Sequence, residues 1–412
     1  MSLSLFQGRT NPSLGDQCKH MNNGILPSRK DAEMSHFNKD QDDIYDRIMD
    51  YANIKWGYKR TQEGKKKFKR ESVLFHRYDS YYLVMIWRSL KHGTYKPDGH
   101  IRFWVYEPKA RMVDAPRLPD KIVQFAVHTA LQEIYKPVFI STSYSCMEGG
   151  GQHRAARQVQ HFMQLCKWQY GEGWIVKLDV KKFYYSIVRD ILKEILRKKI
   201  TCRKTLWLLD TIIDSPGDSE RGVPLGNITS PDFANIYLNE LDQYCKRYLG
   251  IKWYVRFNDD VVAVVRTKED AQNLLSKMTW FLKDKLGLNV NDKTKIFPLA
   301  QGVNAYGYKI WTTHMLVRDD FKRKVKRRIK AMDKKLKAGE MEMPNVQQAV
   351  NASLGHARHS NSYNLMKKIY KNYPYIKVEG ERKFGELLRD GRPRDIAEGR
   401  YRTAKANKPM ED

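Results

Sequence analysis

The sequence predicts an α+β fold, and two kinds of pattern indicate it. Residues 254–265, YVRFNDDVVAVV, place β-branched and aromatic residues on both sides of an Asn-Asp pair, which is typical of two strands joined by a turn. Residues 119–136 instead carry apolar residues at helical spacing, and further helices are predicted over 232–249 and about 268–286. With 412 residues the chain can bury more than one core, so we expect two or three subdomains.

The first third of the chain is predicted to be mainly helical. Residues 1–40 are polar and show no periodicity, so we interpret them as a flexible leader. From 42 to about 100 the pattern is helical with basic inserts, and the insert at 57–77 is expected to hold either a structured RNA or a protein partner. Residues 101–125 predict two short strands around Pro108, followed by a loop that leads into a helix.

The rest of the chain alternates between the two patterns. A glycine-rich turn, SYSCMEGGG, is followed by an amphipathic helix, and WIVKLDVKKFYYSI at 174–187 begins as a strand. After residue 310 the composition becomes more basic. Residues 321–339, FKRKVKRRIKAMDKKLKAG, place apolar residues at helical spacing among many Lys and Arg, which predicts a basic amphipathic helix.

Charge is the strongest global signal. The 75 Lys and Arg residues outnumber the 47 Asp and Glu residues, giving a formal net charge of +28. Such a chain implies a polyanionic partner, most simply nucleic acid, although an anionic membrane surface would also attract it. No segment approaches the ~18–20 apolar residues of a membrane span, and we find no secretory signal pattern. The five cysteines lack CxxC spacing, which argues against structural zinc and favours a reducing compartment, so we expect a cytoplasmic protein without a membrane partner.

The adjacent acids Asp259 and Asp260 lie between apolar runs, where like charges repel and burial increases the repulsion. By themselves they would be interpreted as a solvated turn. A third acid, Asp179, ends the apolar strand 175–178, and carboxylates at two such places are what a two-metal phosphoryl-transfer site requires. Because neighbouring strand residues point in opposite directions, Asp260 is expected to coordinate less directly than Asp259.

An ordered set of motifs resembles those of reverse transcriptases. The segments similar to the palm motifs are LDVKKFYYSI (178–187), GVPLGNITSPDFANIYL (222–238), YVRFNDDVV (254–262), LGLNVNDKTKI (286–296) and AYGYKI (305–310). RMVDAPRLPDKIVQ (111–124) and SYSCMEGGGQHRAARQVQ (143–160) resemble finger motifs of the bacterial branch, which includes group II introns, retrons, diversity-generating retroelements and phage-defence enzymes. A thumb-like NASLGHARHSNSYNLMKKIY at 351–370 extends the match. Each motif is weak alone, whereas their common order is specific.

The resemblance implies a right-hand polymerase fold with α-rich fingers, a palm of antiparallel sheet plus helices, and a helical thumb. The implied domains are a flexible leader (1–40), fingers (41–170), a palm (171–310) with a finger-side insertion at about 190–220, a thumb (311–385) and a basic tail (386–412). The short stretch after the predicted thumb is not expected to hold an RNase H or integrase domain, so priming and any integration are expected to depend on other molecules.

The resemblance also assigns catalytic residues. Asp179, Asp259 and Asp260 are implied to bind two Mg²⁺ ions, with Mn²⁺ as a substitute, and the backbone carbonyl of Val180 is implied as a further ligand. Lys293 matches the lysine credited with protonating the departing pyrophosphate. The alternative for Lys293 is an ordinary solvated lysine.

The dNTP site is implied at Lys109, Arg111, Tyr184, Gly226 and Phe257. A ring at Tyr184 would clash with a 2′-hydroxyl and so favour dNTPs, with core packing as the alternative. Gly226 would let bare backbone approach the nascent base pair. Lys109 and Arg111 lie where the family grips the triphosphate, a role that suits the bidentate fork of arginine.

Nucleic-acid contacts are expected at two further places. His153 and Arg154 follow the glycine triplet and serve either template contact or packing at the start of the helix. The basic helix is expected to contact the backbone of a duplex or a structured RNA, since a merely solvated face normally has mixed charge. Its candidate residues are Lys322, Arg323, Lys326, Arg327 and Lys330.

Two positions depart from the family pattern. The usual Tyr-x-Asp-Asp is replaced by Phe-Asn-Asp-Asp at 257–260, which keeps the ring and loses the hydroxyl, so primer positioning or fidelity is expected to differ. Leu225 stands where many relatives carry Gln, which is similar to retroelements that mutagenise adenines and to some phage-defence enzymes. The mutagenic group typically continues Ser-Gln, whereas this chain has Ser230-Pro231, so its place within the bacterial branch stays open.

The predicted function is RNA-directed DNA synthesis by a bacterial or phage retroelement enzyme, in diversity-generating mutagenesis or antiphage defence. The expected partners are an RNA template, a DNA or RNA primer and dNTPs, with a structured non-coding RNA or an accessory protein in addition. Two alternatives stay open, namely a non-catalytic, maturase-like RNA-binding scaffold and a template-independent DNA polymerase.

Overall fold

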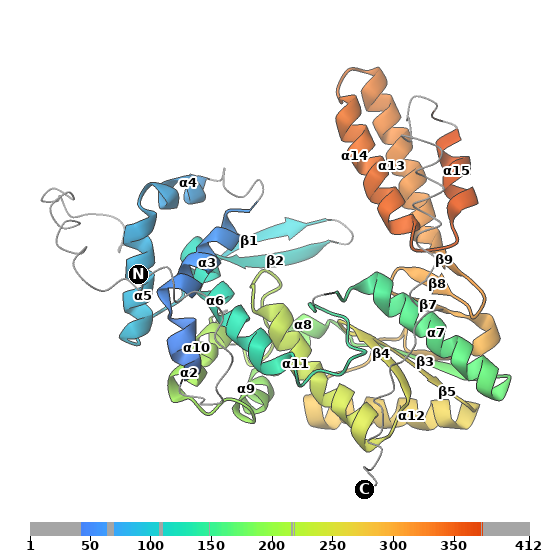
Figure 1. Cartoon of the computed structure of the whole chain (residues 1–412), viewed down its shortest axis with the longest axis horizontal. Helices are drawn as coiled ribbons and strands as arrows, with labels where there is room; N and C mark the ends of the chain where they lie inside the picture. The colour runs from blue at the N-terminus through green and yellow to red at the C-terminus, as the bar shows by residue number, and fades with distance from the viewer. Residues whose placement is uncertain are drawn as a thin grey trace, which may run out of the picture. The chain divides into compact units, whose positions relative to one another are not determined.

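The computed structural model describes residues 43–63, 70–106, 110–147, 149–215, 217, 219–371 and 373 (Figure 1). The chain forms two compact units that alternate along the sequence. The first unit comprises Met1–Ser141, Val180–Gly250 and Lys277–Asn291, and the second comprises Thr142–Asp179, Ile251–Ser276 and Asp292–Asp412. The predicted leader and basic tail lie outside the described residues, and the limits of fingers, palm and thumb stay a prediction.

The first unit is mainly helical, as the pattern before residue 100 predicts. Its N-terminal helices are α2 (Asp43–Ile48), α3 (Tyr51–Thr61), α4 (Arg70–Arg77), α5 (Asp79–Lys91) and α6 (Leu118–Tyr135). The later ones are α8 (Phe183–Ser186), α9 (Arg189–Arg197), α10 (Arg203–Asp214) and α11 (Ser230–Gln243). Two π-helical turns follow, η3 (Tyr244–Tyr248) directly after α11 and η4 (Phe281–Lys285) directly after α12 (Lys268–Trp280). Together α11 with η3 and α12 with η4 confirm the helices predicted over 232–249 and 268–286.

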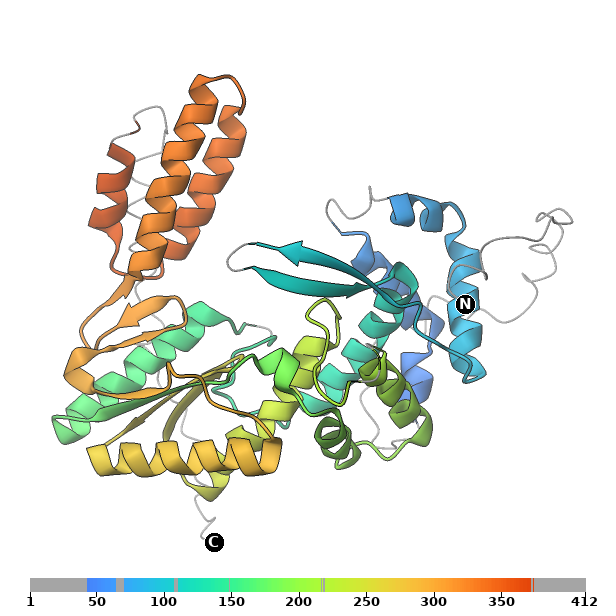
Figure 2. The same ribbon diagram turned by 180° about the vertical axis from the view of Figure 1, so that it is seen from behind.

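The two strands predicted around Pro108 form an antiparallel ribbon in the first unit. β1 (His100–Val105) pairs with β2 (Arg111–Pro116), as the twisted pair of arrows in Figure 2 shows. The side chains of Ile101, Phe103 and Trp104 are exposed although they are apolar. Residues 107–109, between the strands, lie outside the described part of the chain, and so does the predicted site residue Lys109.

The second unit is built on a four-stranded antiparallel sheet. Its strands are β4 (Trp253–Phe257), β5 (Asp260–Val265), β3 (Trp174–Asp179) and β6 (Lys295–Pro298), in that spatial order. Helix α7 (Gln152–Tyr170), which follows the glycine-rich turn, packs against β4 and β5 (Figure 1). A short 3₁₀ turn, η5 (Leu299–Gln301), leads to a second sheet of β7 (Val303–Ala305), β8 (Tyr308–Ile310) and β9 (Met315–Val317).

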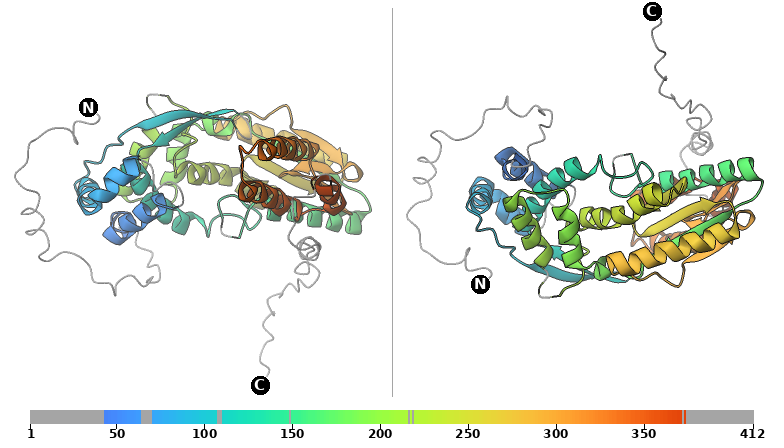
Figure 3. Two further views of the ribbon diagram at one scale, coloured as in Figure 1. Left: turned by 90° about the horizontal axis from the view of Figure 1, so that it is seen from above. Right: turned by 90° about the horizontal axis from the view of Figure 1, so that it is seen from below.

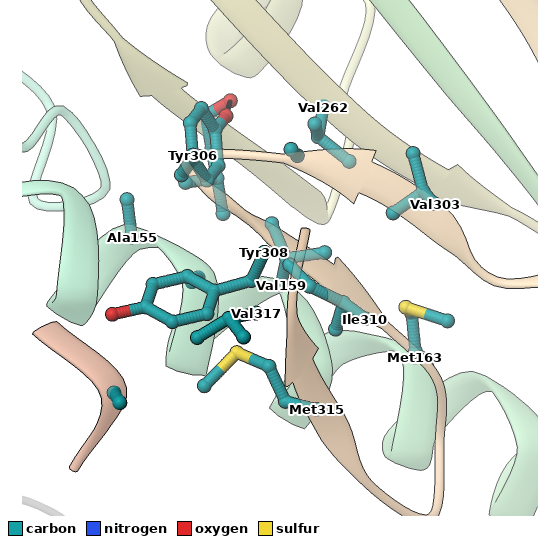
Figure 4. Close-up of a cluster of buried hydrophobic side chains, with 14 of the residues drawn as sticks. Ala155, Val159, Met163, Val262, Val303, Tyr306, Tyr308, Ile310, Met315 and Val317 are labelled. Atoms are coloured by element: carbon teal, nitrogen blue, oxygen red, sulfur yellow. Dashed lines mark hydrogen bonds between the residues drawn. The ribbon is translucent and has the colours of Figure 1, made fainter. Parts of the chain in front are cut away.

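One apolar core joins these parts of the second unit. Figure 4 shows Val159 and Met163 of α7 gathered with Tyr308 and Ile310 of the small sheet and with Met315 of β9. Tyr254, Val255, Val261, Val262 and Val264 of the hairpin are buried, whereas Phe257 and Val265 are half-buried.

Three helices follow the small sheet and extend the same core. They are α13 (Asp319–Lys337), α14 (Met343–Ala357) and α15 (Tyr363–Lys371), which lie side by side in Figure 3. Val325, Ile329 and Met332 of α13 are buried, which confirms the amphipathic helix predicted at 321–339. Among the described residues, no helix has the length and apolar character that crossing a bilayer demands.

Candidate active site

The hairpin predicted from YVRFNDDVVAVV forms the centre of the site. β4 and β5 pair so that Phe257 lies opposite Asp260, and the two residues between them, Asn258 and Asp259, make the turn. Asn258 has a φ of 54°, a left-handed conformation that asparagine tolerates better than most residues. The acids therefore lie at the tip of a hairpin whose strands are buried, as the sequence predicts.

The sheet places Asp179 directly opposite Asp260 in the antiparallel register of β3 and β5. Directly opposite residues share one face of a sheet, with Cα atoms about 4.5–5.5 Å apart. Burial raises the pKa of Asp260, and the nearby Asp179 raises it further. Two carboxylates that are far apart in the sequence, at positions 179 and 260, are thus neighbours in space.

Asp259 belongs to the turn and not to a strand. Asp260 was expected to coordinate less directly than Asp259 on the premise that both are strand residues, whose side chains alternate. Because side chains alternate only within a strand, that premise does not hold here. Which of the two coordinates a metal more directly stays a prediction.

Basic side chains surround Asp260. The ammonium Nζ of Lys177 lies 3.8 Å from Oδ1 of Asp260 and also donates a hydrogen bond of 2.8 Å to the carbonyl of Asn304. Burial raises the pKa of Asp260 most strongly, while the charges of Lys177, Arg318 and Lys293 lower it. These cations favour the ionised carboxylate, the form that a metal ion or a phosphate-bound metal requires.

Two hydroxyl groups hold the backbone at the carboxylates. The backbone N–H of Asp179 donates to Oγ1 of Thr294 at 3.2 Å, so the start of β6 supports the end of β3. The hydroxyl of Tyr306 lies within donating distance of the carbonyl of Val255, at 3.0 Å, and of Asp260, at 3.3 Å. Phe257, the ring kept from the family motif, packs edge-on against Tyr306 at 6.0 Å between ring centroids.

The loop before α7 supports the hairpin from its other edge. The backbone of Arg256 donates to the carbonyl of Thr142 at 3.1 Å and accepts from the N–H of Tyr144 at 3.0 Å. The hydroxyl of Ser145 accepts a hydrogen bond from the N–H of Asn258. The side chain of Arg256 is fully buried and donates to the carbonyl of Asn258 at 3.1 Å, so it holds the turn from beneath.

The predicted magnesium site can be tested against this donor set. Within the described residues, no group of three or more His, Cys, Asp and Glu side chains is arranged to hold a metal ion. Mg²⁺ is usually bound by one or two carboxylates and completes its shell with water and substrate phosphates. The pair Asp179 and Asp260 fits that requirement, with Asp259 in the adjoining turn.

Lys293 lies in the turn before β6 and is exposed, and its charge acts on Asp260. It therefore lies near the carboxylates, as a proton donor to departing pyrophosphate would, and its role stays a prediction. Val180, Tyr184 and Gly226 belong to the first unit, whereas the three aspartates belong to the second.

The surroundings of Tyr184 and Gly226 are clear within the first unit. Tyr184 lies in α8, half-buried, with its ring 5.6 Å from that of Phe183. A Cβ on Gly226 would lie 2.4 Å from the carbonyl oxygen of Asp114 and 2.6 Å from Cα of Ala115. The backbone of β2 fills the space beside Gly226, so glycine is needed there for packing, and its contact with a base pair stays a prediction.

His153 and Arg154 begin α7, and the structure shows what each touches. His153 is half-buried, with Nδ1 2.6 Å from the hydroxyl of Tyr308 and its ring stacked on His359 at 4.0 Å. Arg154 is exposed and donates to the carbonyl of Gly149 at 2.9 Å. For His153 the packing alternative is present in the structure, and nucleic-acid contact by either residue stays a prediction.

The remaining predicted contacts are on the surface. Arg111, the first residue of β2, is exposed. On α13, Arg323, Lys326, Arg327 and Lys330 are exposed on the side away from the buried apolar residues, while Lys322 pairs with Asp319 at 2.8 Å. Binding of nucleic acid by this basic face stays a prediction.

Several residues at the site were not predicted from the sequence, namely Lys177, Thr294, Tyr306, Arg318, Arg256 and Ser145. Lys177 had a usable signal, because it stands two positions before Asp179 on the same strand and therefore shares its face. Arg256 acts on Asn258, two positions further along the chain, whereas Thr294, Tyr306, Arg318 and Ser145 act on residues of distant segments, which no local pattern reveals.

Comparison with known proteins gives one family. The model of the reverse transcriptase (RNA-dependent DNA polymerase) family matches residues 96–310, slightly more than half of the chain. Protein YkfC of Escherichia coli is 29% identical over 262 residues, which are 53% of this chain and 68% of YkfC. The group II intron-encoded protein LtrA of Lactococcus lactis is 31% identical over 168 residues, which are 38% of this chain and 27% of LtrA.

A solved telomerase from Candida tropicalis is also similar, with a TM-score of 0.45 and 12% identity over 72% of this chain and 62% of the telomerase. The chain thus spans about two thirds of YkfC and less than a third of LtrA.

Proposed function

The chain belongs to the reverse transcriptase (RNA-dependent DNA polymerase) family, and we propose that it copies RNA into DNA by metal-dependent nucleotidyl transfer. The observation that supports this activity is the register that places Asp179 opposite Asp260, beside the turn that carries Asp259. Carboxylates so close together and partly buried are costly unless cations compensate them.

Mg²⁺ ions, when bound, would activate the primer 3′-hydroxyl and neutralise charge on the triphosphate. The three aspartates would supply the oxygen ligands, and the carbonyl of Val180 a further one. Lys177, Lys293 and Arg318 favour the ionised form of Asp260. Lys293, which is exposed beside this carboxylate, is proposed to give a proton to the departing pyrophosphate.

The other predicted residues would select and hold the substrates. Arg111, with Lys109, would bind the triphosphate, and the ring of Tyr184 would exclude a 2′-hydroxyl. The exposed basic face of α13 would bind the phosphate backbone of the primer and template without reading their sequence. We propose a dedicated RNA as the template and a role in a bacterial or phage retroelement, in mutagenesis or in antiphage defence.

Primer extension on an RNA template with a DNA primer, Mg²⁺ and labelled dNTPs tests this proposal. We expect template-dependent extension, and a loss of about 10²–10³-fold or more for Asp179→Asn and for Asp259→Ala. Asp190→Asn is a matched control, because the side chain of Asp190 is 84% exposed on α9. Binding of the template–primer should survive in all three variants, since the changed groups are not phosphate ligands.

The same assay separates the alternatives. Extension that continues without template would identify a template-independent polymerase. Tight RNA binding without extension by the parent would identify a non-catalytic scaffold, and activity unchanged by Asp259→Ala would refute the assignment of the site.

A further inference from the structure

A stack of aromatic rings stands in the first unit where the two π-helical turns meet. The ring of Tyr244 stacks on that of Phe281, with centroids 4.4 Å apart and planes inclined by 15°. Tyr248 stacks on the same Tyr244 at 5.4 Å and 16°. We call Tyr248, Tyr244 and Phe281 the aromatic ladder, because their rings form one continuous stack drawn from η3 and η4.

Packing accounts for the inner part of the ladder and not for its outer end. Tyr244 and Phe281 are half-buried and join the two turns. Tyr248 is 80% exposed, although one side of its ring is stacked on Tyr244. A second large aromatic side chain, Trp280, is 48% exposed at the end of α12, directly before η4. An exposed tyrosine at the end of a stack adds little to a core, so a ligand is the better explanation for its position.

The backbone at the ladder is also unusual. The N–H of Leu249 donates to the carbonyl of Tyr244 at 2.9 Å, a bond that spans five residues and widens the helix. Such π-helical turns are rare and are often found at functional sites. Here two of them carry the stacked rings.

The charge around the ladder favours a polyanion. The sequences of the two turns, YCKRY and FLKDK, contain Lys246, Arg247, Lys283 and Lys285 against the single acid Asp284. Lys285 also lies near Trp280, with Nζ 5.9 Å from the ring centroid. Aromatic rings bordered by cations are the features by which proteins bind unpaired bases together with their phosphates.

We propose that the aromatic ladder binds single-stranded nucleic acid, with an unpaired base stacked on Tyr248 and the neighbouring phosphates held by the lysines and arginine of η3 and η4. This surface uses none of the residues assigned to nucleotidyl transfer. Because every base has an aromatic face, the contact is expected to tolerate many sequences. It would give the protein a second point of attachment for an unpaired strand.

Binding of a short fluorescein-labelled oligouridylate to the full chain tests the proposal, with fluorescence anisotropy as the readout and without dNTPs. Tyr248→Ala should weaken binding by about 5- to 150-fold, the range expected for one base–aromatic stack. Tyr248→Trp should keep the affinity because it keeps a ring. Tyr81→Ala is the matched control, since Tyr81 is also an exposed tyrosine of the first unit, 50% exposed on α5.

Measurements at two salt concentrations sharpen the test. Higher salt weakens the phosphate contacts, including those of the basic helix, and leaves stacking as a larger share of the affinity. The ratio between the parent and Tyr248→Ala should therefore persist at high salt. A parallel series with oligothymidylate shows whether RNA or any single strand is bound. With 4-thiouridine in the RNA, photo-crosslinks should map to η3 or η4.

Equal binding by Tyr248→Ala and the parent at both salt concentrations, with crosslinks elsewhere, would overturn the proposal. A change in sedimentation caused by Tyr248→Ala, without a change in nucleic-acid binding, would also overturn it and identify the ladder as a contact between copies of the chain. Because the assay contains no dNTPs, a failure of the proposed polymerisation would not alter its result.

Discussion

The molecule contains two antiparallel hairpins that carry predicted site residues, and they differ in how they are held. The β4–β5 hairpin lies within a four-stranded sheet, and Val255, Val262 and Val264 are almost completely buried. The β1–β2 ribbon has two strands only, and apolar side chains such as Phe103 and Trp104 stay exposed.

The difference shows why the carboxylates have a defined place. A slip of one residue in β5 would exchange the side chains that pack on its two faces, both of which are buried, so the core fixes the register that brings Asp260 to Asp179. A two-stranded ribbon with exposed faces has no such penalty and is marginally stable by itself. The candidate catalytic acids therefore depend on a core, whereas Arg111 depends on the contacts that hold β2, such as the packing of its backbone against Gly226.

The largest expected effect comes from placing a charge in each hairpin. Val264→Asp should lower the free energy of unfolding by about 3 kcal/mol or more, because an unpaired carboxylate would enter the apolar core between Ile175 and Trp253. Ile101→Asp in the ribbon should change it by about 0.5 kcal/mol or less, since Ile101 is exposed. Chemical denaturation of both variants measures the difference. Equal losses would show that the ribbon is as tightly packed as the sheet.

A second experiment asks how firmly β2 is held by its neighbour. Gly226→Ala would bring a Cβ to 2.4 Å from the carbonyl of Asp114, so β2 or the 224–228 loop must shift. We expect Gly226→Ala to lower the free energy of unfolding by about 1–3 kcal/mol. Gly355→Ala is the control, because a Cβ there meets nothing within 4 Å and alanine favours the helix α14. A melting temperature of Gly226→Ala equal to that of the parent would show that β2 moves aside without cost and is held only loosely by its neighbour.

The smallest expected effects concern how stability depends on pH, and one titrating group in each unit allows the two units to be compared. In the second unit, burial and the nearby cations Arg157 and Arg358 lower the pKa of His359 from 6.5 to about 4. Between pH 4 and pH 6.5 the unfolded chain therefore binds more protons than the folded chain. The contribution of His359 to the free energy of unfolding is fully present above pH 6.5 and falls as the pH drops toward 4. His359→Phe should flatten this part of the melting temperature profile. An unchanged slope would mean that other groups control it.

In the first unit the pKa of Asp120 shifts in the opposite direction. Burial raises the pKa of Asp120 from 3.8 to about 6, while its hydrogen bonds from Tyr95 and from the N–H of Asp98 oppose the shift. The folded state then holds the proton more tightly, so this contribution is present below pH 3.8 and is lost as the pH rises through 6. Asp120→Asn should remove this fall of stability with rising pH, because asparagine does not ionise. A melting profile of this variant identical to the parent's would show that Asp120 titrates as in the unfolded chain.

Much of the local structure could be predicted from residue patterns. The hairpin at 254–265, the helix α6 and the basic amphipathic helix α13 appear where periodicity predicts them, because each pattern reflects one buried face. The order of the motifs also identified the family before the fold was known. The Asn-Asp pair also predicted the turn at 258–259, whereas which strand lies beside this hairpin, and in which register, could not be predicted from local patterns.

The sequence by itself determined which acids belong to the candidate site, which segments are strands and helices, and that the chain is strongly basic. Only the tertiary structure decided that Asp260 is the residue opposite Asp179 and that Thr294, Tyr306 and Arg318 surround them. Periodicity records how a segment buries its own face within a few residues. Pairing between strands and hydrogen bonds between distant loops depend on the register and packing of the whole unit, and these exist only after the chain has folded.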